Sequence, residues 1–189
     1  MIKIEKIVTL AKGRFLELQE VFFDYYGKKR SWEVCKSHNS VSILIYDKDL
    51  DSLVLVKQFR LPVYMKNSDG YTLELCAGLC DKDLPNVEIA KEEILEECGY
   101  DVDVDDIHKI TSTWSNVGSS GSKQDIYYAE VNQKMKVSQG GGIEDEDIEL
   151  VYVKQDEVLD MIFDERIALT PGAKFAMHWW LYNRKKGEK

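Results

Sequence analysis

The sequence of 189 residues contains no long hydrophobic run. A membrane-spanning helix needs roughly 20 consecutive apolar residues, and no stretch of this chain approaches that length. The first residues also lack the apolar core of a secretory signal peptide. We therefore expect a cytoplasmic protein that has no membrane partner.

Cysteine pairs with the spacing of a metal or redox site are also missing. The four cysteines, Cys35, Cys76, Cys80 and Cys98, include no CxxC motif. A structural zinc ion usually has four cysteine or histidine ligands at short, regular spacing, which this sequence does not offer. We expect buried, reduced thiols instead.

The third feature that the sequence lacks is an excess of basic residues, which a basic surface would need. The chain has 34 acidic and 25 basic residues, and its formal net charge is -9. Nucleic acids and anionic membranes both bind basic surfaces, so the charge argues against either partner. An anionic substrate would need a local positive charge, which a divalent metal ion would supply.

Hydrophobic residues make up 44% of the chain, which suits one compact domain or one domain with a small appendage. Strands are predicted at residues 15–26, 31–35, 40–46, 52–59, 70–76, 108–114, 124–131 and 148–153, and helices at residues 85–98 and 171–183. This order favours an α+β fold or an α/β/α sandwich over a doubly wound sheet. We expect a β-arm at residues 1–38 and the main domain at residues 39–189.

The predicted helix at residues 85–98 has an apolar stripe beside an acidic flank. With a period of about 100° per residue, the stripe comprises Val87, Ala90, Ile94 and Cys98. The flank comprises Glu93, Glu96 and Glu97. These carboxylates repel one another, and the helix dipole disfavours negative charge in the last turns. Mg²⁺ or Mn²⁺, which bind hard oxygen ligands, would relieve the repulsion. A solvated acidic face is the alternative interpretation.

Residues 77–100 resemble the Nudix box, G-x5-E-x7-R-E-U-x-E-E-x-G-U, in which U is a bulky apolar residue. The matching residues are Gly78, Glu93, Ile94, Glu96, Glu97, Gly99 and Tyr100. Two positions depart from the pattern, because Leu84 replaces the first glutamate and Glu92 replaces the arginine. In the family that arginine helps to orient the first catalytic glutamate, so the local charge network here must differ.

The resemblance extends over about residues 30–183. The segments SHNSVSILIY, LVLVKQFRLPVY, YTLELCAGL, WSNVGSSGS and GGGIEDEDIEL resemble the UDP-glucose pyrophosphatase branch of the Nudix family, which is related to the ADP-ribose pyrophosphatases. ADP-ribose pyrophosphatases usually carry a proline after the box, where this chain has Asn116, Val117 and Gly118. The resemblance implies an α/β/α sandwich with a mixed sheet. It also implies a homodimer that exchanges an N-terminal β-domain, here residues 1–38.

The resemblance also implies a metal site and a catalytic base. The metal ligands of Mg²⁺ (or Mn²⁺) would be Glu93, Glu96, Glu97 and the backbone carbonyl of Ala77. Glu97 is also implied to act in catalysis. The acidic loop at residues 140–148 would supply the base, with Glu144 in that role and Glu146 as a supporting carboxylate near the metal. Its three glycines would let it close. A solvated acidic turn is the alternative for both residues.

Substrate binding is expected at Arg60, Glu74, Gly78 and Trp32. Arg60 ends a predicted strand and would bind a phosphate through two hydrogen bonds; a surface ion pair is the alternative. Glu74 precedes the box and would brace it. Trp32, in the predicted arm, would stack on the uracil base, within one subunit or across a dimer; a core position is its alternative.

These residues lead to one main hypothesis and two alternatives. The main hypothesis is Mg²⁺-dependent hydrolysis of UDP-glucose to UMP and glucose 1-phosphate. The first alternative keeps the chemistry but takes ADP-ribose as substrate. The second is a catalytically silent Nudix fold that binds a nucleotide or a protein, which the substitutions Leu84 and Glu92 keep open.

Overall fold

The computed structural model describes residues 1–143 and 146–187, with side chains through residue 184. The chain forms two compact units. The first, which we call the arm unit, comprises Met1–Ser40 and Thr113–Gln124. The second, the sheet unit, comprises Val41–Ser112 and Asp125–Lys189.

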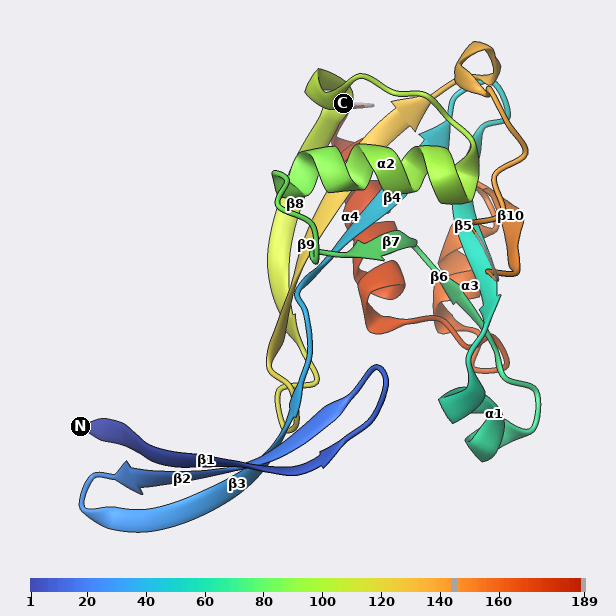
Figure 1. The fold of residues 1–189 in the computed structure, drawn as a ribbon. Helices are drawn as coiled ribbons and strands as arrows, with labels where there is room; N and C mark the ends of the chain where they lie inside the picture. The colour runs from blue at the N-terminus through green and yellow to red at the C-terminus, as the bar shows by residue number, and fades with distance from the viewer. Residues whose placement is uncertain (144–145, 188–189) are drawn as a thin grey trace. The chain divides into compact units, whose positions relative to one another are not determined.

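The arm unit contains a three-stranded antiparallel sheet in the order β1-β2-β3 (Figure 1). Its strands are β1 (Ile2–Lys12), β2 (Glu17–Tyr25) and β3 (Lys28–Lys36). Tyr26 and Gly27 connect β2 to β3 with φ angles of 54° and 84°. Positive φ at both positions is the geometry of a two-residue hairpin turn, whose twist matches that of its strands.

The arm differs from the sequence prediction in two places. The gap at residues 27–30 between the predicted strands 15–26 and 31–35 is too long, because Lys28 already pairs with Tyr25 in the ladder. Strand β1 was not predicted at all. Two register shifts, between Ile4 and Lys6 and between Thr9 and Ala11, interrupt its pairing with β2. Such irregularities break the alternation of apolar and polar residues on which strand prediction depends.

The sheet unit is built on a sheet in the order β10-β5-β4-β9-β8, in which β6 also pairs with β5 and β7 with β4. The strands are β4 (Ser40–Asp47), β5 (Ser52–Phe59), β6 (Tyr71–Glu74), β7 (Cys76–Leu79), β8 (Ile107–Ser115), β9 (Ser122–Val131) and β10 (Ile148–Lys154). The predicted strands between residues 40 and 153 all lie at these positions. The one predicted at 70–76 is divided by Leu75 into β6 and the start of β7.

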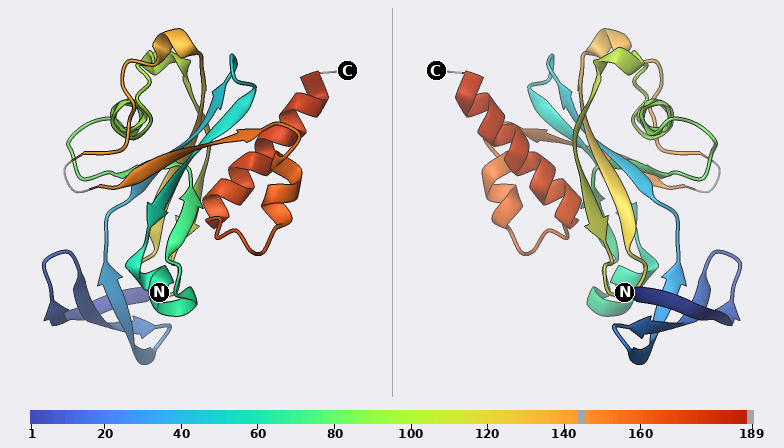
Figure 2. Two further views of the ribbon diagram at one scale, coloured as in Figure 1. Left: turned by 90° about the vertical axis from the view of Figure 1, so that its right-hand side faces the viewer. Right: turned by 90° about the vertical axis from the view of Figure 1, so that its left-hand side faces the viewer.

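Helices cover both faces of this sheet (Figure 2). Successive residues of a strand point to opposite faces. Val41, Ile43 and Ile45 of β4 therefore pack in one core with α2 (Asn86–Cys98). Leu44 and Tyr46 pack in the other core with α3 (Val158–Phe163) and α4 (Pro171–Gly187). The fold is thus an α+β fold of the α/β/α type, as predicted.

Two short helices escaped the sequence prediction. Helix α1 (Leu61–Asn67) has no buried residue, so it carries no amphipathic pattern. Helix α3 has only six residues, which is too few for a helical period to emerge. No helix among the described residues is long and apolar enough to cross a membrane.

The predicted acidic helix is present as α2, between Pro85 and Gly99. Gly99 ends it with a φ of 74°, the left-handed conformation that glycine adopts readily. The buried residues of α2 are Ile89, Ala90, Ile94, Glu97 and Cys98. The predicted stripe therefore holds at its last three positions, while Val87 is only partly buried and Ile89 was missed.

Candidate active site

Glu97 reaches from the last turn of α2 to strand β7. Its side chain is buried, with only 5% of the residue exposed. The backbone amide of Ala77 donates a hydrogen bond to Glu97 Oε2 over 2.9 Å. The helix and the strand thus bring together two of the predicted metal-site residues, 20 positions apart in sequence.

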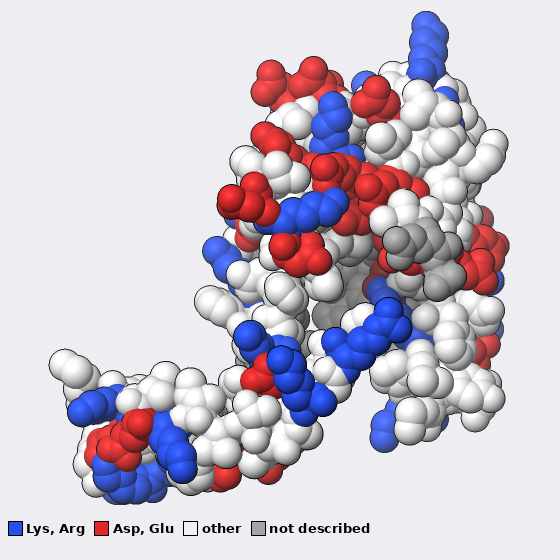
Figure 3. Space-filling model, in the orientation of Figure 1, with Lys and Arg blue, Asp and Glu red and all other residues white. Residues whose placement is uncertain are grey.

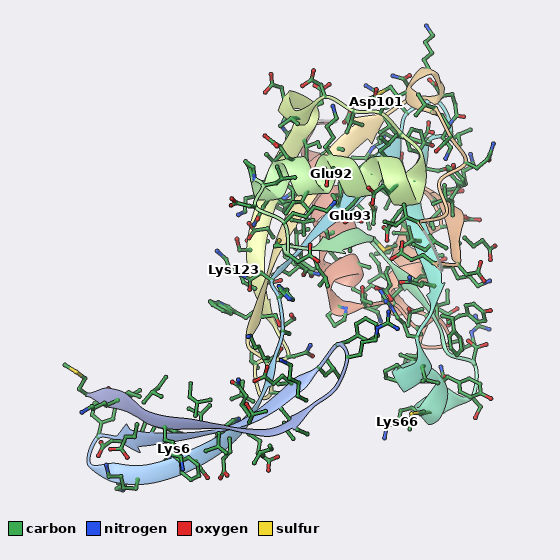
Figure 4. The ribbon with its side chains drawn as sticks, in the orientation of Figure 1. Lys6, Lys66, Glu92, Glu93, Asp101 and Lys123 are labelled. Carbon is green, nitrogen blue, oxygen red and sulfur yellow. The ribbon has the colours of Figure 1, made fainter. Side chains whose placement is uncertain are left out.

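Glu93 lies one helical turn earlier on α2 (Figure 4). Its side chain packs directly against Gly78. A Cβ atom added to Gly78 would lie 1.9 Å from Glu93 Oε1. Any side chain at position 78 would therefore displace the carboxylate. The opening glycine of the box is needed for this close contact.

The site concentrates negative charge. Burial, and then the charges of Glu97 and Glu96, raise the pKa of Glu93 to about 7. Burial also raises the pKa of Glu97 to about 7, although the Ala77 amide opposes the shift. In Figure 3 acidic side chains gather over α2 on the face shown. A cation bound between these carboxylates would stabilise their ionised forms.

Glu146 contributes a further carboxylate, and its negative charge raises the pKa of both Glu93 and Glu97. Glu146 Oε2 accepts a hydrogen bond of 3.2 Å from the Ile143 amide. A Cβ atom on Gly142 would lie 2.6 Å from the same oxygen. The structure thus brings the predicted supporting carboxylate to the site, while Glu144, the predicted base, lies outside the described residues.

Arg60 and Glu74 form a bidentate ion pair, with Nε–Oε1 2.8 Å and Nη2–Oε2 3.0 Å. The Thr72 hydroxyl donates to Glu74 Oε1 over 2.6 Å. Although burial acts against it, these hydrogen bonds lower the pKa of the Glu74 carboxyl. The expected ion-pair alternative for Arg60 is therefore present. A guanidinium has five N–H groups, so this pair leaves donors for a phosphate.

Glu92, one of the two departures from the Nudix box, forms an ion pair with a residue outside the helix. Lys82, on the segment before α2, lies with Nζ 2.5 Å from Glu92 Oε2. Leu84 is 38% exposed, so it occupies no place in the core. An ion pair therefore joins this segment to the helix, with its acidic member at the position where the box has arginine. The helical period could not predict this pair, because Lys82 lies outside the helix.

The start of α2 is fixed by a buried carboxylate of β9. Asn86 Nδ2 donates to Asp125 Oδ2 over 3.0 Å. Asp125 also accepts hydrogen bonds from Lys109 Nζ and Ser112 Oγ, each over 2.6 Å. Burial opposes the shift, but these three donors lower the pKa of Asp125 to about 2.

The end of α2 is held by the segment at residues 136–142. Lys136 Nζ donates to the Cys98 carbonyl over 2.7 Å, and the Gly141 amide donates to the Glu97 carbonyl over 2.8 Å. A Cβ atom on Gly140 would lie 2.2 Å from the Glu97 carbonyl oxygen. The sequence prediction gave the glycines the role of freeing the loop. In the structure Gly140 instead permits a close backbone contact.

Trp32 lies in β3 of the arm unit rather than in the sheet unit that carries the glutamates. Its indole nitrogen donates to the Gly118 carbonyl over 2.9 Å. The residue is 57% exposed, which excludes the alternative of a core position within this chain.

The donor set suits a hard divalent cation, because it consists of carboxylates and backbone carbonyls. The contact of Glu93 with Gly78 and the raised pKa values show a crowded cluster whose negative charge Lys82 and Arg60 only partly offset. Among the described residues, no group of three or more His, Cys, Asp or Glu side chains is already arranged to hold a metal ion. The side chains would therefore have to turn toward a bound cation.

Comparisons with known proteins agree with this fold and site, although no family model matches the chain. The uridine diphosphate glucose pyrophosphatase NUDT14 of Bos taurus is 34% identical, over 94% of this chain and 95% of the relative. A GDP-mannose pyrophosphatase of Salmonella arizonae is 39% identical, over 82% of this chain and 85% of the relative. A crystal structure of an ADP compounds hydrolase superposes with a TM-score of 0.73 at 21% identity, covering 97% of this chain and 95% of that one.

The helix that carries Glu93 thus packs against Gly78 within an α/β/α sandwich, and the ADP compounds hydrolase structure shares this fold. The chain belongs to the Nudix family of hydrolases.

Proposed function

We propose that the protein hydrolyses the diphosphate bridge of UDP-glucose to give UMP and glucose 1-phosphate. The placement of Glu93 and Glu97 against Gly78 and Ala77 carries this proposal, since it brings a half-buried and a buried carboxylate together where α2 meets β7. The two relatives named as UDP-glucose pyrophosphatases, of Bos taurus and Mus musculus, support the choice of substrate.

Glu93, Glu96 and Glu97, with the Ala77 carbonyl, would hold Mg²⁺, and Mn²⁺ has the same preference for oxygen ligands. The bound cation would neutralise charge on the diphosphate and acidify the attacking water. The chain's own part is to present these ligands: Gly78 leaves room for Glu93, and the Ala77 amide orients Glu97.

Hydrolysis consumes one water molecule. A P–O bond forms to the water oxygen, one P–O bond of the bridge breaks, and the protons of the water are released. We assign proton removal to Glu144, with Glu146 beside it as a supporting carboxylate. The proximity of Glu146 to the site supports this assignment, because its charge acts on both Glu93 and Glu97 and it lies in the same acidic segment of the sequence.

Arg60 would bind a substrate phosphate with the N–H groups that its pair with Glu74 leaves over. Glu74 would hold the guanidinium in one orientation, which lowers the entropy lost on binding. Trp32 would stack on the uracil ring, since its exposed indole offers a free aromatic face.

The test is a product assay across UDP-glucose, GDP-mannose and ADP-ribose, with and without MgCl₂ or MnCl₂. The proposal expects equal amounts of UMP and glucose 1-phosphate, only in the presence of a divalent cation. If UDP-glucose binds but no UMP is released at any cation concentration, the protein is a catalytically silent Nudix fold and the proposal is wrong.

GDP-mannose is the second candidate substrate, because GDP-mannose pyrophosphatases of several bacteria are 32–39% identical to this chain. ADP-ribose is a third. The chemistry at the diphosphate is the same for all, so the ratio of kcat/KM values decides among them. If kcat/KM is higher for GDP-mannose than for UDP-glucose, GDP-mannose is the preferred substrate, and the proposed cleavage of the diphosphate bridge still holds.

We also propose that the chain is a homodimer formed through residues 1–38. The arm unit carries nine Lys and Arg against five Asp and Glu, whereas the rest of the chain carries 16 against 29. Large apolar side chains of the arm are exposed, among them Ile4 and Phe15. A basic, apolar surface complements the acidic one of a second copy. Sedimentation equilibrium should give twice the chain mass, and a monomer at all concentrations would refute this.

A cytoplasmic location is the last part of the proposal. Its support is the state of Cys35, Cys76, Cys80 and Cys98, all of which are free thiols. Reducing compartments preserve free thiols. Fractionation of cells that express the tagged protein would test it.

A further inference from the structure

We propose that Lys136 is a positioning residue that fastens the segment at residues 136–142 to the end of α2 and thereby sets the backbone of the metal-site glutamates. The inference rests on the proposed function, because it concerns the same site. It assigns a role to a residue outside the Nudix box.

The last carbonyls of a helix have no partner within the helix. In this protein a distant segment supplies the partners. The backbone hydrogen bonds are Gly141 N to Glu97 O (2.8 Å), Gly142 N to Glu96 O (3.2 Å) and Val137 N to Gly99 O (2.9 Å). The segment therefore takes the place of the next helical turn, and it does so at the residues whose side chains form the site.

Two glycines allow the backbones to approach this closely. A Cβ atom on Gly99 would lie 2.3 Å from the Ser138 carbonyl oxygen, and one on Gly140 would lie 2.2 Å from the Glu97 carbonyl oxygen. Both glycines also have positive φ angles, of 74° and 70°. The contact therefore combines one isolated antiparallel bridge, between Tyr100 and Lys136, with a close approach of backbones that the two glycines permit.

Lys136 provides the only side-chain ammonium recorded in this contact among the described residues. Its Nζ donates to the Cys98 carbonyl over 2.7 Å and to the Tyr152 hydroxyl over 3.3 Å. The same Nζ lies 4.4 Å from the centroid of the Tyr100 ring. A cation is favoured both at the negative end of a helix and over an aromatic face, so the two effects act together.

The Tyr100 ring, which Lys136 contacts, is itself held in place by hydrogen bonds. The Tyr100 hydroxyl donates to Asp47 Oδ2 over 2.8 Å, and Gln133 Nε2 also donates to that carboxylate. Asp47 is fully buried, and its other oxygen accepts the amides of Asp49 and Leu50. Lys136 therefore ties the end of α2 to a rigid part of the core rather than to another surface side chain.

Glu96 and Glu97 take part in this contact through their carbonyls and in the site through their carboxylates. A shift of the backbone at the end of α2 therefore moves both carboxylates. The same segment leads to Glu146, which packs on Gly142. Removing the ammonium of Lys136 loosens both sides of the site at once, and a displacement of about 1 Å can cost roughly a hundredfold in rate.

The experiment compares Lys136→Met, which keeps the length of the side chain, with Lys136→Arg, which keeps the charge. Lys134→Met is the matched control, since Lys134 is exposed and lies two residues away. Amide hydrogen exchange of residues 137–142 is measured in metal-free protein, and kcat, KM and the Mg²⁺ concentration for half-maximal activity are measured with substrate. The exchange readout is independent of the substrate, so a wrong substrate assignment does not affect it.

We expect Lys136→Met to accelerate exchange at residues 137–142 and to lower kcat by about tenfold or more, with KM changed less. Lys136→Arg should keep most of the wild-type protection from exchange and most of the wild-type kcat. Lys134→Met should match the wild type in both. Normal exchange in Lys136→Met, or fast exchange with an unchanged kcat, would overturn the proposal. So would unprotected amides at residues 137–142 of the wild type, a measurement that does not depend on any variant folding.

Discussion

Lys82 Nζ lies 2.5 Å from Glu92 Oε2, and this ion pair connects the segment before α2 to the middle of the helix. The two side chains are 46% and 40% exposed, so the pair contributes at most about 1 kcal/mol to folding. The ion pair matters mainly for its effect on the neighbouring carboxylate of Glu93. The positive charge of Lys82 lowers the pKa of Glu93, opposing the larger effects of burial and of the other glutamates.

The first prediction is that activity depends on the ion pair between Lys82 and Glu92 rather than on the sign of the charge at either position. Lys82→Glu puts a third like charge beside Glu92 and Glu93, and we expect kcat/KM at limiting Mg²⁺ to fall about fivefold, equivalent to roughly 1 kcal/mol. The double variant Lys82→Glu/Glu92→Lys should regain most of that loss. A double-mutant cycle measures the coupling. A double variant no better than the poorer single variant would contradict the prediction.

The second prediction concerns the contact of Gly78 with Glu93. In Gly78→Ala the new methyl group would overlap the carboxylate, which must turn away. We expect kcat to fall by about a hundredfold while the melting temperature changes little, since a ligand is displaced by an ångström or more. Gly13→Ala is the control, because its Cβ would meet only the Leu16 carbonyl at 3.6 Å. Equal activity of the two variants would argue against a role for Glu93.

The third prediction separates the metal role of Glu97 from its structural role. Glu97→Gln keeps an oxygen for the Ala77 amide but loses the negative charge. We expect kcat to fall by about a hundredfold or more and the increase in melting temperature caused by Mg²⁺ to shrink, with the metal-free melting temperature near that of the wild type. Glu88→Gln, an exposed position on the same helix, is the control. A large loss of stability with activity intact would refute the assignment.

The fourth prediction is a pH dependence of stability from Asp125. Its folded pKa of about 2 lies below the ordinary aspartate value of 3.8, so it stabilises the fold above pH 4 and loses that contribution as the pH falls toward 2. We expect Asp125→Asn to cost about 2 kcal/mol of unfolding free energy at neutral pH and progressively less below pH 4. Denaturant unfolding at several pH values measures this difference. A constant difference across that range would show that Asp125 acts by packing alone.

Local patterns predicted the main elements well. The hairpin of β4 and β5 and the helix α2 could be predicted because their apolar residues follow the periods of strand and helix. The grouping of Glu93 with Gly78 also followed from a motif. The sequence could not predict that Asp125 holds the start of α2, because 39 residues separate it from Asn86 and no periodicity links them.

The charge network of the site was harder to predict. Lys82 and Lys136 both act on α2 from outside it, one before the helix and one 38 residues after Cys98. An ion pair was the expected alternative for Arg60, but the sequence did not predict that Glu74 would be its partner. Such pairs depend on how loops return to the helix, which single-sequence patterns do not encode.

Helix α2 is clamped at both ends by remote parts of the chain, with Asn86 bound to Asp125 and the Cys98 carbonyl bound to Lys136. A synthetic peptide of residues 76–100 would contain every box residue and neither anchor. It would therefore be a poor chelator, because short helices fray in water and its glutamates would repel one another freely. Anyone grafting this motif onto another scaffold must transplant the two anchors with it.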